Sequence, residues 1–334
     1  MRFCLRIVFP VLCIMMFFAA KAQTNNWAWM KGDRRSAMSP EYGSKGVTSV
    51  YNDAGARTGF ASWKDASGNF WVFGGYSDYM SGRLNDLWKY DPTSNQWTWI
   101  NGDTVKNKSG VYGTQGVASA SNYPGSRMNS VTWADALGNL WLFGGYGYAS
   151  GGSPGYLADL WKYNIATNQW TWVKGSIGVN SAANYNTSQG VPGSNNIPGS
   201  AENAAGWVDG SGNLWMFGGT GYNFSAFQSG RLNMLWKFNP STSEWTWYKG
   251  DQGVDQVGVY GTQGTPAAGN KPGSRRYATS WADASGNLWL FGGNGIGASG
   301  DGALNDLWKY NIASGQWTWM KGDNTVGQAS VYGT

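Results

Sequence analysis

The chain has 334 residues, of which 51 are Gly and 22 are Trp, and only 13% are charged. This composition excludes a mainly helical protein, which needs more Ala, Leu, Glu and Lys, and it favours short strands joined by many turns. The formal net charge of +5 falls by three, to +2, if residues 1–22 are removed. A nearly neutral chain gives no reason to expect binding to nucleic acid or to an anionic membrane surface.

Residues 1–22 have the pattern of a secretory signal peptide. Arg2 and Arg6 form a basic start, residues 7–18 are apolar, and Ala20-Lys21-Ala22 places small residues at the cleavage positions. The apolar run is too short to span a bilayer comfortably, which argues against a membrane anchor. We therefore expect export, cleavage before Gln23, no membrane insertion afterwards, and a secreted or cell-surface protein.

Both cysteines, Cys4 and Cys13, lie inside this leader. The processed chain then has no disulfide, no thiolate metal site and no cysteine nucleophile. Directly after the leader, residues 26–31 predict a single strand, because Trp27 and Trp29 are two residues apart and so share a face.

One unit then repeats four times, and we expect the four copies at residues 56–100, 126–173, 200–248 and 274–320. Each copy predicts four strands, as in the stretches RMNSVTWAD, NLWLFGG, LNDLWKY and QWTWV. Asp-Ala-Ser-Gly-Asn or a near copy forms the turn between the first two strands. Trp recurs at fixed places in every copy, so we expect these side chains to pack between the sheets and not to form a sugar-binding platform.

A lone four-stranded sheet cannot cover both of its faces, whereas radial stacking of successive sheets can. The fold class is therefore all-β, a β-propeller. The stretches GNLWLFGG, LNDLWKYD and QWTW resemble the kelch motif, with a diglycine after the second strand, a Tyr in the third and a Trp in the fourth. The resemblance covers residues 27–321, with a unit longer than the usual kelch period of about 50 residues.

The strand at 26–31 matches the last fourth strand, Gln316-Trp317-Thr318-Trp319-Met320-Lys321. Kelch propellers commonly close their ring with a terminal strand from the other end of the chain. The sequence contains five fourth strands but four sets of the other three, which predicts a larger ring and a chain truncated after Thr334. The alternative is a small ring of four blades with one fourth strand displaced.

Long and variable segments fall on one face of the predicted disc. They are the links between second and third strands and those between fourth and following first strands, whereas the other links are short and uniform. Such loops on a regular scaffold usually form binding surfaces. Plain tolerance of surface insertions is the alternative.

Two residue types on that face are candidate ligand contacts. Arg57, Arg127 and Arg275 recur six residues before the first-strand Trp, where they could ring the mouth of the channel and bind carboxylates or sulfates. Ala201 interrupts this series, and a structural salt bridge to a neighbouring blade, for example through the Asp two residues after the first-strand Trp, is an equal alternative. The long loops also carry tyrosines that can stack on sugars or contact a protein: Tyr76, Tyr146, Tyr148 and Tyr222.

Some kelch propellers, such as galactose oxidase and its relatives, are enzymes. That family's copper site uses two His and a Tyr joined to a Cys, and this chain has no His. We expect no cofactor, no metal and no catalytic residue here, and therefore a non-catalytic module that binds a glycan or a protein. The alternative is a carbohydrate-active enzyme, of the galactose oxidase or sialic-acid mutarotase type, whose catalytic residues are absent from this segment.

Overall fold

The computed structural model describes residues 28–223 and 228–331. The chain divides into two units, residues 1–31 and residues 32–334, and each is described by itself. The predicted signal peptide lies outside the described residues, as do residues 26 and 27 of the predicted N-terminal strand. Residues 28–31 are not in a strand, because none of the strand pairings includes them. The strand expected at 26–31 is therefore not formed in its described part.

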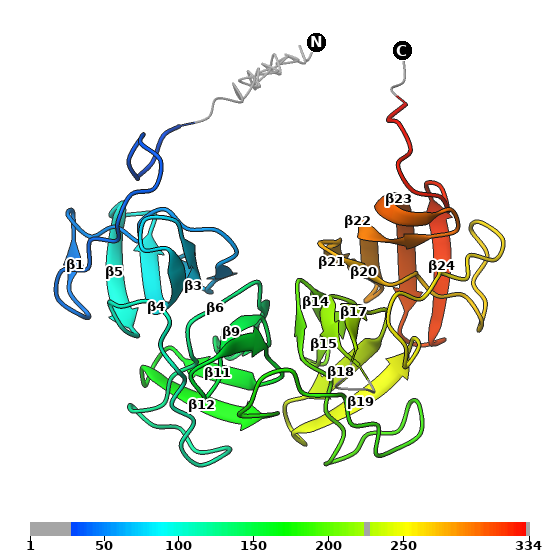
Figure 1. Cartoon of the computed structure of the whole chain (residues 1–334), viewed down its shortest axis with the longest axis horizontal. Coiled ribbons are helices and arrows are strands. Elements are labelled where there is room, and N and C mark those ends of the chain that lie inside the picture. Colours follow the sequence, from blue (N-terminus) through cyan, green and yellow to red (C-terminus); the bar gives the residue numbers. More distant parts are fainter. Residues whose placement is uncertain (1–27, 224–227, 332–334) are drawn as a thin grey trace, which may run out of the picture. The chain divides into compact units, whose positions relative to one another are not determined.

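Four consecutive repeats make up the described part of the second unit, which contains strands and no helix (Figure 1). Repeat 1 contains β1 (Thr48–Ser49), β2 (Ala61–Lys64), β3 (Phe70–Ser77), β4 (Gly82–Asp91) and β5 (Gln96–Asn101). Repeat 4 contains β20 (Arg275–Arg276), β21 (Thr279–Ala282), β22 (Leu288–Gly297), β23 (Gly300–Asn311) and β24 (Gln316–Lys321). Among the described residues no helix could cross a membrane.

The two middle repeats are each split into a four-stranded and a three-stranded sheet. Repeat 2 contains β6 (Arg127–Met128), β7 (Val131–Ala134), β8 (Leu140–Phe143), β9 (Tyr146–Tyr148), β10 (Pro154–Tyr156), β11 (Leu160–Asn164) and β12 (Gln169–Lys174). Repeat 3 contains β13 (Ala201–Glu202), β14 (Ala205–Val208), β15 (Leu214–Phe217), β16 (Thr220–Tyr222), β17 (Ser229–Arg231), β18 (Leu235–Asn239) and β19 (Glu244–Lys249). We call β2, β7, β14 and β21 the first strands, with the second, third and fourth strands following in each repeat.

Each repeat has a diglycine at this point, where the strand of repeats 1 and 4 continues with a register shift and repeats 2 and 3 divide into two sheets. Gly144 and Gly145 separate β8 from β9, and both have positive φ, at 64° and 95°. A Cβ on Gly145 would lie 2.5 Å from the Met128 carbonyl oxygen, so another residue would meet both strain and a clash. The backbone therefore changes direction here, and the hairpin β9–β10 forms a separate small sheet with β6.

The predicted turn between first and second strands is confirmed in every repeat. In repeat 2 the Asp135 carboxylate accepts hydrogen bonds from the backbone N–H groups of Leu137 and Asn139 and from the Asn139 side chain. It also accepts one from the indole N–H of Trp141, at 2.7 Å. The acid after the first-strand Trp is thus fully used in shaping the turn.

The link that precedes each first strand covers the outer edge of the fourth strand. In repeat 1 this link forms β1, which pairs with β5, and Ser119 makes the equivalent bridge to Trp170 in repeat 2. The buried Asn122 side chain donates to the carbonyls of Val117 and Trp170, at 3.0 and 3.3 Å. The same position in the other repeats holds a buried asparagine: Asn52, Asn196 and Asn270. Much of each link is therefore spent on protecting a sheet edge, which leaves less of it for ligand binding.

We expect Asn122→Ala to lower the free energy of unfolding by about 1 to 3 kcal/mol, because it removes a buried hydrogen bond to the Trp170 carbonyl and a partly buried one to the Val117 carbonyl. Urea unfolding followed by Trp fluorescence measures the loss. Ser121→Ala is the control, since Ser121 is exposed on the same link. Equal stability of the two variants would show that the asparagine does not hold the link to the fourth strand.

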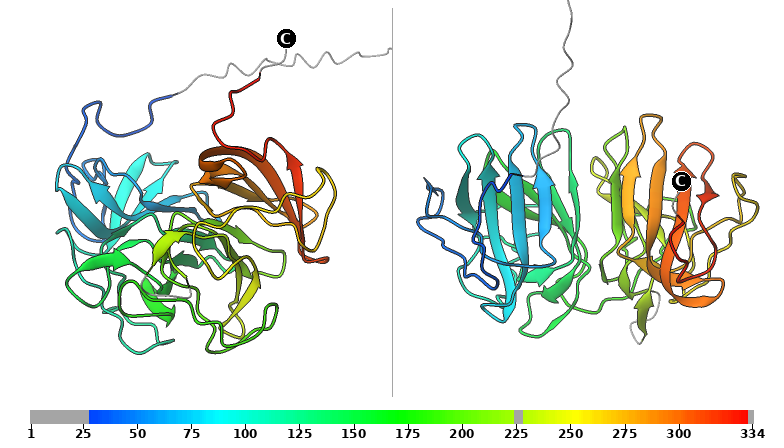
Figure 2. Two further views of the ribbon diagram at one scale, coloured as in Figure 1. Left: turned by 45° about the vertical axis from the view of Figure 1, so that its right-hand side comes forward. Right: turned by 90° about the horizontal axis from the view of Figure 1, so that it is seen from above.

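The repeats lie next to one another in chain order, and the first strands follow one another as neighbours (Figures 1 and 2). Three hydrophobic clusters fill the spaces between successive repeats. The Trp side chains that were predicted to pack between sheets do so at these junctions, and Trp161, Trp236 and Trp308 are 0–1% exposed. Trp281 is 41% exposed, because it stacks on Trp289 of its own repeat and no further repeat among the described residues packs against it.

Candidate functional site

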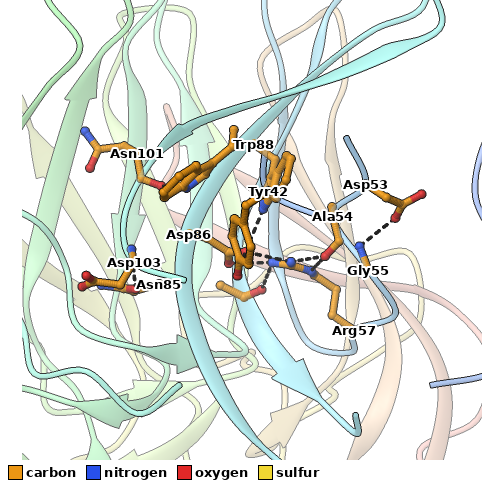
Figure 3. A network of polar contacts seen from close by, with 12 residues as sticks. Tyr42, Asp53, Ala54, Gly55, Arg57, Asn85, Asp86, Trp88, Asn101 and Asp103 are labelled. Carbon is orange, nitrogen blue, oxygen red and sulfur yellow. Dashed lines mark hydrogen bonds and ion pairs between the residues drawn. The ribbon is translucent and has the colours of Figure 1, made fainter. Parts of the chain in front are cut away.

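The three arginines singled out in the sequence are not available to a ligand. The side chains of Arg57, Arg127 and Arg275 are at most 4% exposed, and each is paired with an Asp of the third strand in its own repeat. In repeat 2 the guanidinium of Arg127 donates to both oxygens of Asp159, at 2.6 and 2.7 Å, and also to the Gly144 carbonyl. Figure 3 shows the equivalent pair of Arg57 and Asp86 in repeat 1. These arginines form structural salt bridges, but the partner is an Asp of the same repeat and not, as the alternative had it, a group of a neighbouring blade.

Each of these carboxylates also accepts hydrogen bonds from two aromatic side chains. Tyr112 OH and the Trp161 indole N–H both donate to Asp159, each at 2.7 Å. Burial raises the pKa of Asp159, but Arg127 and these hydrogen bonds outweigh it, so that the pKa lies below its usual value. Burial, together with the Asp159 charge, raises the pKa of Tyr112. The whole network is therefore a closed structural unit.

Repeat 3 replaces this network by apolar and neutral groups. Ala201 takes the place of the arginine, and Met234 takes the place of the acid. Tyr185, which corresponds to Tyr112, directs its hydroxyl to the Asn223 side-chain oxygen and the Met234 sulfur. The indole N–H of Trp236 is left without a hydrogen-bond partner. Repeat 3 therefore lacks both members of the ion pair, the arginine and its Asp, and carries Ala201 and Met234 in their places.

A second set of residues lies beside the diglycines. Strand pairing brings three positions of each repeat side by side, namely the residue after the buried-arginine position, the residue after the diglycine, and its partner in the following hairpin. These rows are Thr58–Tyr76–Arg83, Met128–Tyr146–Tyr156, Glu202–Thr220–Arg231 and Arg276–Asn294–Ala303. We call these twelve residues the inner rows.

Side chains of the inner rows meet across the repeats. The Arg83 guanidinium of repeat 1 lies 4.6 Å from the Tyr146 ring of repeat 2. Tyr156 contacts Tyr146 edge to face, at 5.2 Å between ring centres, and Tyr222 of repeat 3 at 5.9 Å. Loops from three repeats therefore form a single aromatic and cationic surface.

Glu202 is the acid of this surface. Its carboxylate accepts a hydrogen bond from the Asn129 side chain of repeat 2, at 2.9 Å. Burial raises the pKa of Glu202, opposed by the Asn129 hydrogen bond and by the charges of Arg276 and Arg83. Since Arg83 belongs to repeat 1 and Arg276 to repeat 4, charges from two other repeats act on this carboxyl group of repeat 3. A polar centre with both signs of charge results.

Several polar atoms of this centre have no hydrogen-bond partner among the described residues. They are buried, which makes an unpaired state costly. They comprise Arg83 Nε, Arg276 Nε, Thr220 Oγ1, Asn203 Nδ2 and Asn294 Oδ1. The two Nε atoms and Asn203 Nδ2 are donors, Asn294 Oδ1 is an acceptor, and the Thr220 hydroxyl is both. Such a set suits a ligand that can both accept and donate hydrogen bonds.

A pocket opens between repeats 3 and 4 at this surface. It is lined by Thr220, Gly230, Arg231, Asp255, Arg276, Ile296 and Asp301. Arg231 donates to Asp301 at 2.7 Å and lies 3.8 Å from Asp255, so it is held on one side of the pocket. Arg276 forms no ion pair with a described residue of the pocket, and its guanidinium lies 5.1 Å from the Tyr277 ring. The pocket walls therefore combine two cations and two carboxylates.

The four predicted tyrosines occupy different places. Tyr146 and Tyr222 belong to the aromatic surface described above, and Tyr76 lies in the inner row of repeat 1. Tyr148 is half-buried in β9 opposite Pro154. All four remain candidate ligand contacts, whereas Arg83, Glu202 and Arg276 were missed by the sequence reasoning. The sequence position could have indicated two of them, because Glu202 directly follows Ala201 and Arg276 directly follows Arg275 in the buried-arginine series.

Within the described residues no group of three or more His, Cys, Asp or Glu side chains is placed to hold a metal ion. The repeated acids Asp65, Asp135, Asp209 and Asp283 are engaged in turns, and Asp86, Asp159 and Asp306 in ion pairs.

Comparison with known proteins supports the fold. Residues 67–98 match the family model described as the Kelch motif. This segment spans the turn before β3, the diglycine, β4 and the first half of β5. No curated protein matches the chain. The kelch match, together with several four-stranded antiparallel sheets and no helix, fits a kelch-repeat β-propeller.

Proposed function

Because kelch repeats build β-propellers that commonly serve as protein-binding scaffolds, we propose that this chain is a non-catalytic binding module and that its ligand is a glycan held at the inner rows. The observation that carries the proposal is the set of buried polar atoms without partners around Arg83, Glu202 and Arg276. These atoms are poised for hydrogen bonds that no described residue provides.

A glycan suits this surface for two reasons. Sugar hydroxyls both donate and accept, which matches a site that contains guanidinium, amide, hydroxyl and carboxyl groups together. The tyrosine rings beside them offer apolar faces and edges for the C–H groups of a sugar. The cations Arg83, Arg231 and Arg276 are balanced by Glu202, Asp255 and Asp301, so a strongly charged ligand has no advantage.

Export of the module is part of the proposal. It rests on the signal-peptide pattern of residues 1–22. Expression in a secreting host followed by N-terminal sequencing tests it, and we expect a mature chain that begins at Gln23. An uncleaved chain retained in the cell would contradict it.

We expect Arg276→Ala to weaken binding of a glycan by at least about tenfold, because one hydrogen bond to a charged group contributes roughly 1.5 to 3 kcal/mol. A glycan array with the intact protein identifies the ligand, and calorimetry with wild type and variant measures the change. Lys64→Ala is the matched control, since it removes an exposed positive charge at the other end of a repeat, beside the turn that starts at Asp65.

Two outcomes would overturn this proposal. Turnover of a bound glycan would show an enzyme, as the galactose oxidase or mutarotase alternative requires. Binding to a protein but to no glycan would replace the ligand class, in keeping with kelch propellers, which typically bind proteins.

A further inference from the structure

An acid of the inner rows lies beside the pocket between repeats 3 and 4. Glu202 and Thr220 are direct partners in the pairing of β13 with β16, so their side chains lie side by side on one face of this sheet. Thr220 and Arg276 both line the pocket, which has a volume of about 310 Å³. This volume is at the lower end of the range for small-molecule sites. Glu202 is therefore placed next to a space that suits a small ligand.

The Glu202 carboxylate retains acceptor capacity. Asn129 donates to its Oε2, at 2.9 Å, whereas its Oε1 receives no hydrogen bond from a described residue. Arg276 and Arg83 act on this carboxyl through their charges, but no ion pair joins it to either guanidinium in the described part of the chain. An ionised carboxylate has room for about four hydrogen bonds. Most of this capacity is therefore free for a ligand.

Donors without partners lie around this acid. Arg276 Nε and Arg83 Nε are buried, and neither donates to a described residue. The hydroxyl of Thr220 is also buried and has no partner among the same residues. A guanidinium donates hydrogen bonds and cannot accept them, whereas an ionised carboxylate only accepts. A ligand that satisfies both must accept and donate from atoms that are close together.

Among the polar groups of glycans, adjacent hydroxyls meet this requirement. Each hydroxyl donates one hydrogen bond and accepts others, so two neighbours on a sugar ring can serve Glu202 and Arg276 together. The carboxylate of a uronic acid cannot donate, and it would face the like charge of Glu202. The ammonium group of an amino sugar cannot accept, and it would face guanidinium groups. Tyr156 and Tyr222, 5.9 Å apart between ring centres, provide apolar contact for the sugar ring.

We propose that the inner rows select neutral glycans and that Glu202 determines this selectivity. Its carboxylate accepts a hydrogen bond from one of two adjacent sugar hydroxyls, while Arg276 and Thr220 donate to the pair. The negative charge of Glu202 also disfavours a carboxylate on the sugar, despite the nearby arginines. This inference rests on the proposed function, because it names the class of glycan that the inner rows bind.

Matched pairs of sugars test the selectivity. The probes are the methyl glycosides of glucose, galactose and mannose and those of the corresponding uronic acids, which differ from them only at C6. By calorimetry at neutral pH, we expect the intact protein to bind at least one neutral sugar at least about tenfold more tightly than its uronic acid. Glu202→Gln should weaken binding of the neutral sugar at least about tenfold and strengthen binding of the uronic acid. A purely structural role of Glu202 would weaken both.

Glu41→Gln is the matched control, since it removes an exposed carboxyl on the link of repeat 1, outside the inner rows. It should leave both affinities unchanged. Uronic acids that bind as tightly as the neutral sugars, no binding of any of these sugars, or a loss of both affinities in Glu202→Gln would overturn the inference. The glycan array then decides whether the proposed function falls with it, because binding to other glycans leaves that function standing and binding to none removes both.

A pH series on the wild type tests Glu202 without any substitution. Burial raises the pKa of Glu202, so its carboxyl takes up a proton at a higher pH than an ordinary Glu, whose pKa is about 4.3. We expect the affinity for the neutral sugar to fall as the pH falls through this raised value. The reason is that the protonated carboxyl loses its charge and part of its acceptor capacity.

The groups that face Glu202 do not produce this fall. Burial raises the pKa of Tyr156, which stays neutral. The other facing groups are guanidinium groups, which keep their charge, or groups that do not titrate: Arg83, Arg231, Arg276, Asn129 and Thr220. Asp255 and Asp301 of the pocket are present in Glu202→Gln as well. The affinity of this variant should therefore lack the fall that the wild type shows, and the same pH profile in both would overturn the inference.

Discussion

Replacing Arg127 by Ala is expected to lower the free energy of unfolding by about 3 to 5 kcal/mol, because it leaves the Asp159 carboxylate buried and unpaired. Both side chains are at most 1% exposed, and the guanidinium donates to both carboxylate oxygens. Burial of a charge without its partner is among the largest single costs that a point substitution can cause. Urea unfolding followed by Trp fluorescence measures the change.

The same substitution should be much less harmful when the acid is removed with it. Repeat 3 shows the outcome, because Ala201 and Met234 occupy the two positions and the repeat keeps the same strands. Arg127→Ala with Asp159→Met should therefore recover most of the lost stability. The Tyr112 hydroxyl and the Trp161 indole then lack an acceptor, and we expect Ala149→Asn to restore the first, since Asn223 serves Tyr185 in this way.

The pH dependence gives an independent readout. The folded pKa of Asp159 is lowered, so its contribution to stability is present above the ordinary carboxyl pKa of about 4 and is lost as the pH falls through the folded value. The double variant lacks this carboxyl and should lose less stability than the wild type between pH 7 and pH 3. A double variant as unstable as Arg127→Ala would show that the ion pair is not exchangeable for apolar packing.

Local patterns in the sequence were sufficient for the strands and the core. The spacing of Trp133, Trp141, Trp161 and Trp170 has a direct physical meaning, because period-two alternation sets the face of each side chain and burial of large rings sets the stacking. The acid of each turn, such as Asp135, was also predictable, since its partners are at most six residues away.

The arginine partners were not predictable in this way, because they depend on which strands are neighbours. Arg127 and Asp159 are 32 residues apart and meet only after the hairpin of repeat 2 has folded back. The one usable clue was that Ala201 and Met234 depart from the pattern in the same repeat. The inner rows depend similarly on the register across the hairpins, which relates Arg83 to Tyr76 and Arg231 to Thr220.

Trp170→Ala is expected to cost about 3 to 5 kcal/mol, and Trp97→Ala clearly less, although both remove the first Trp of a fourth strand. Trp170 is 1% exposed and contacts Phe73 of repeat 1, so its loss leaves a cavity between two repeats. Trp97 is half-buried, with no repeat described on its outer side. Trp97→Ala therefore leaves a space that is partly open to water, and no closed cavity forms.

Thermal unfolding of the two variants measures the difference, and it should place Trp170→Ala well below Trp97→Ala. Equal losses would mean that Trp97 is packed as tightly as Trp170.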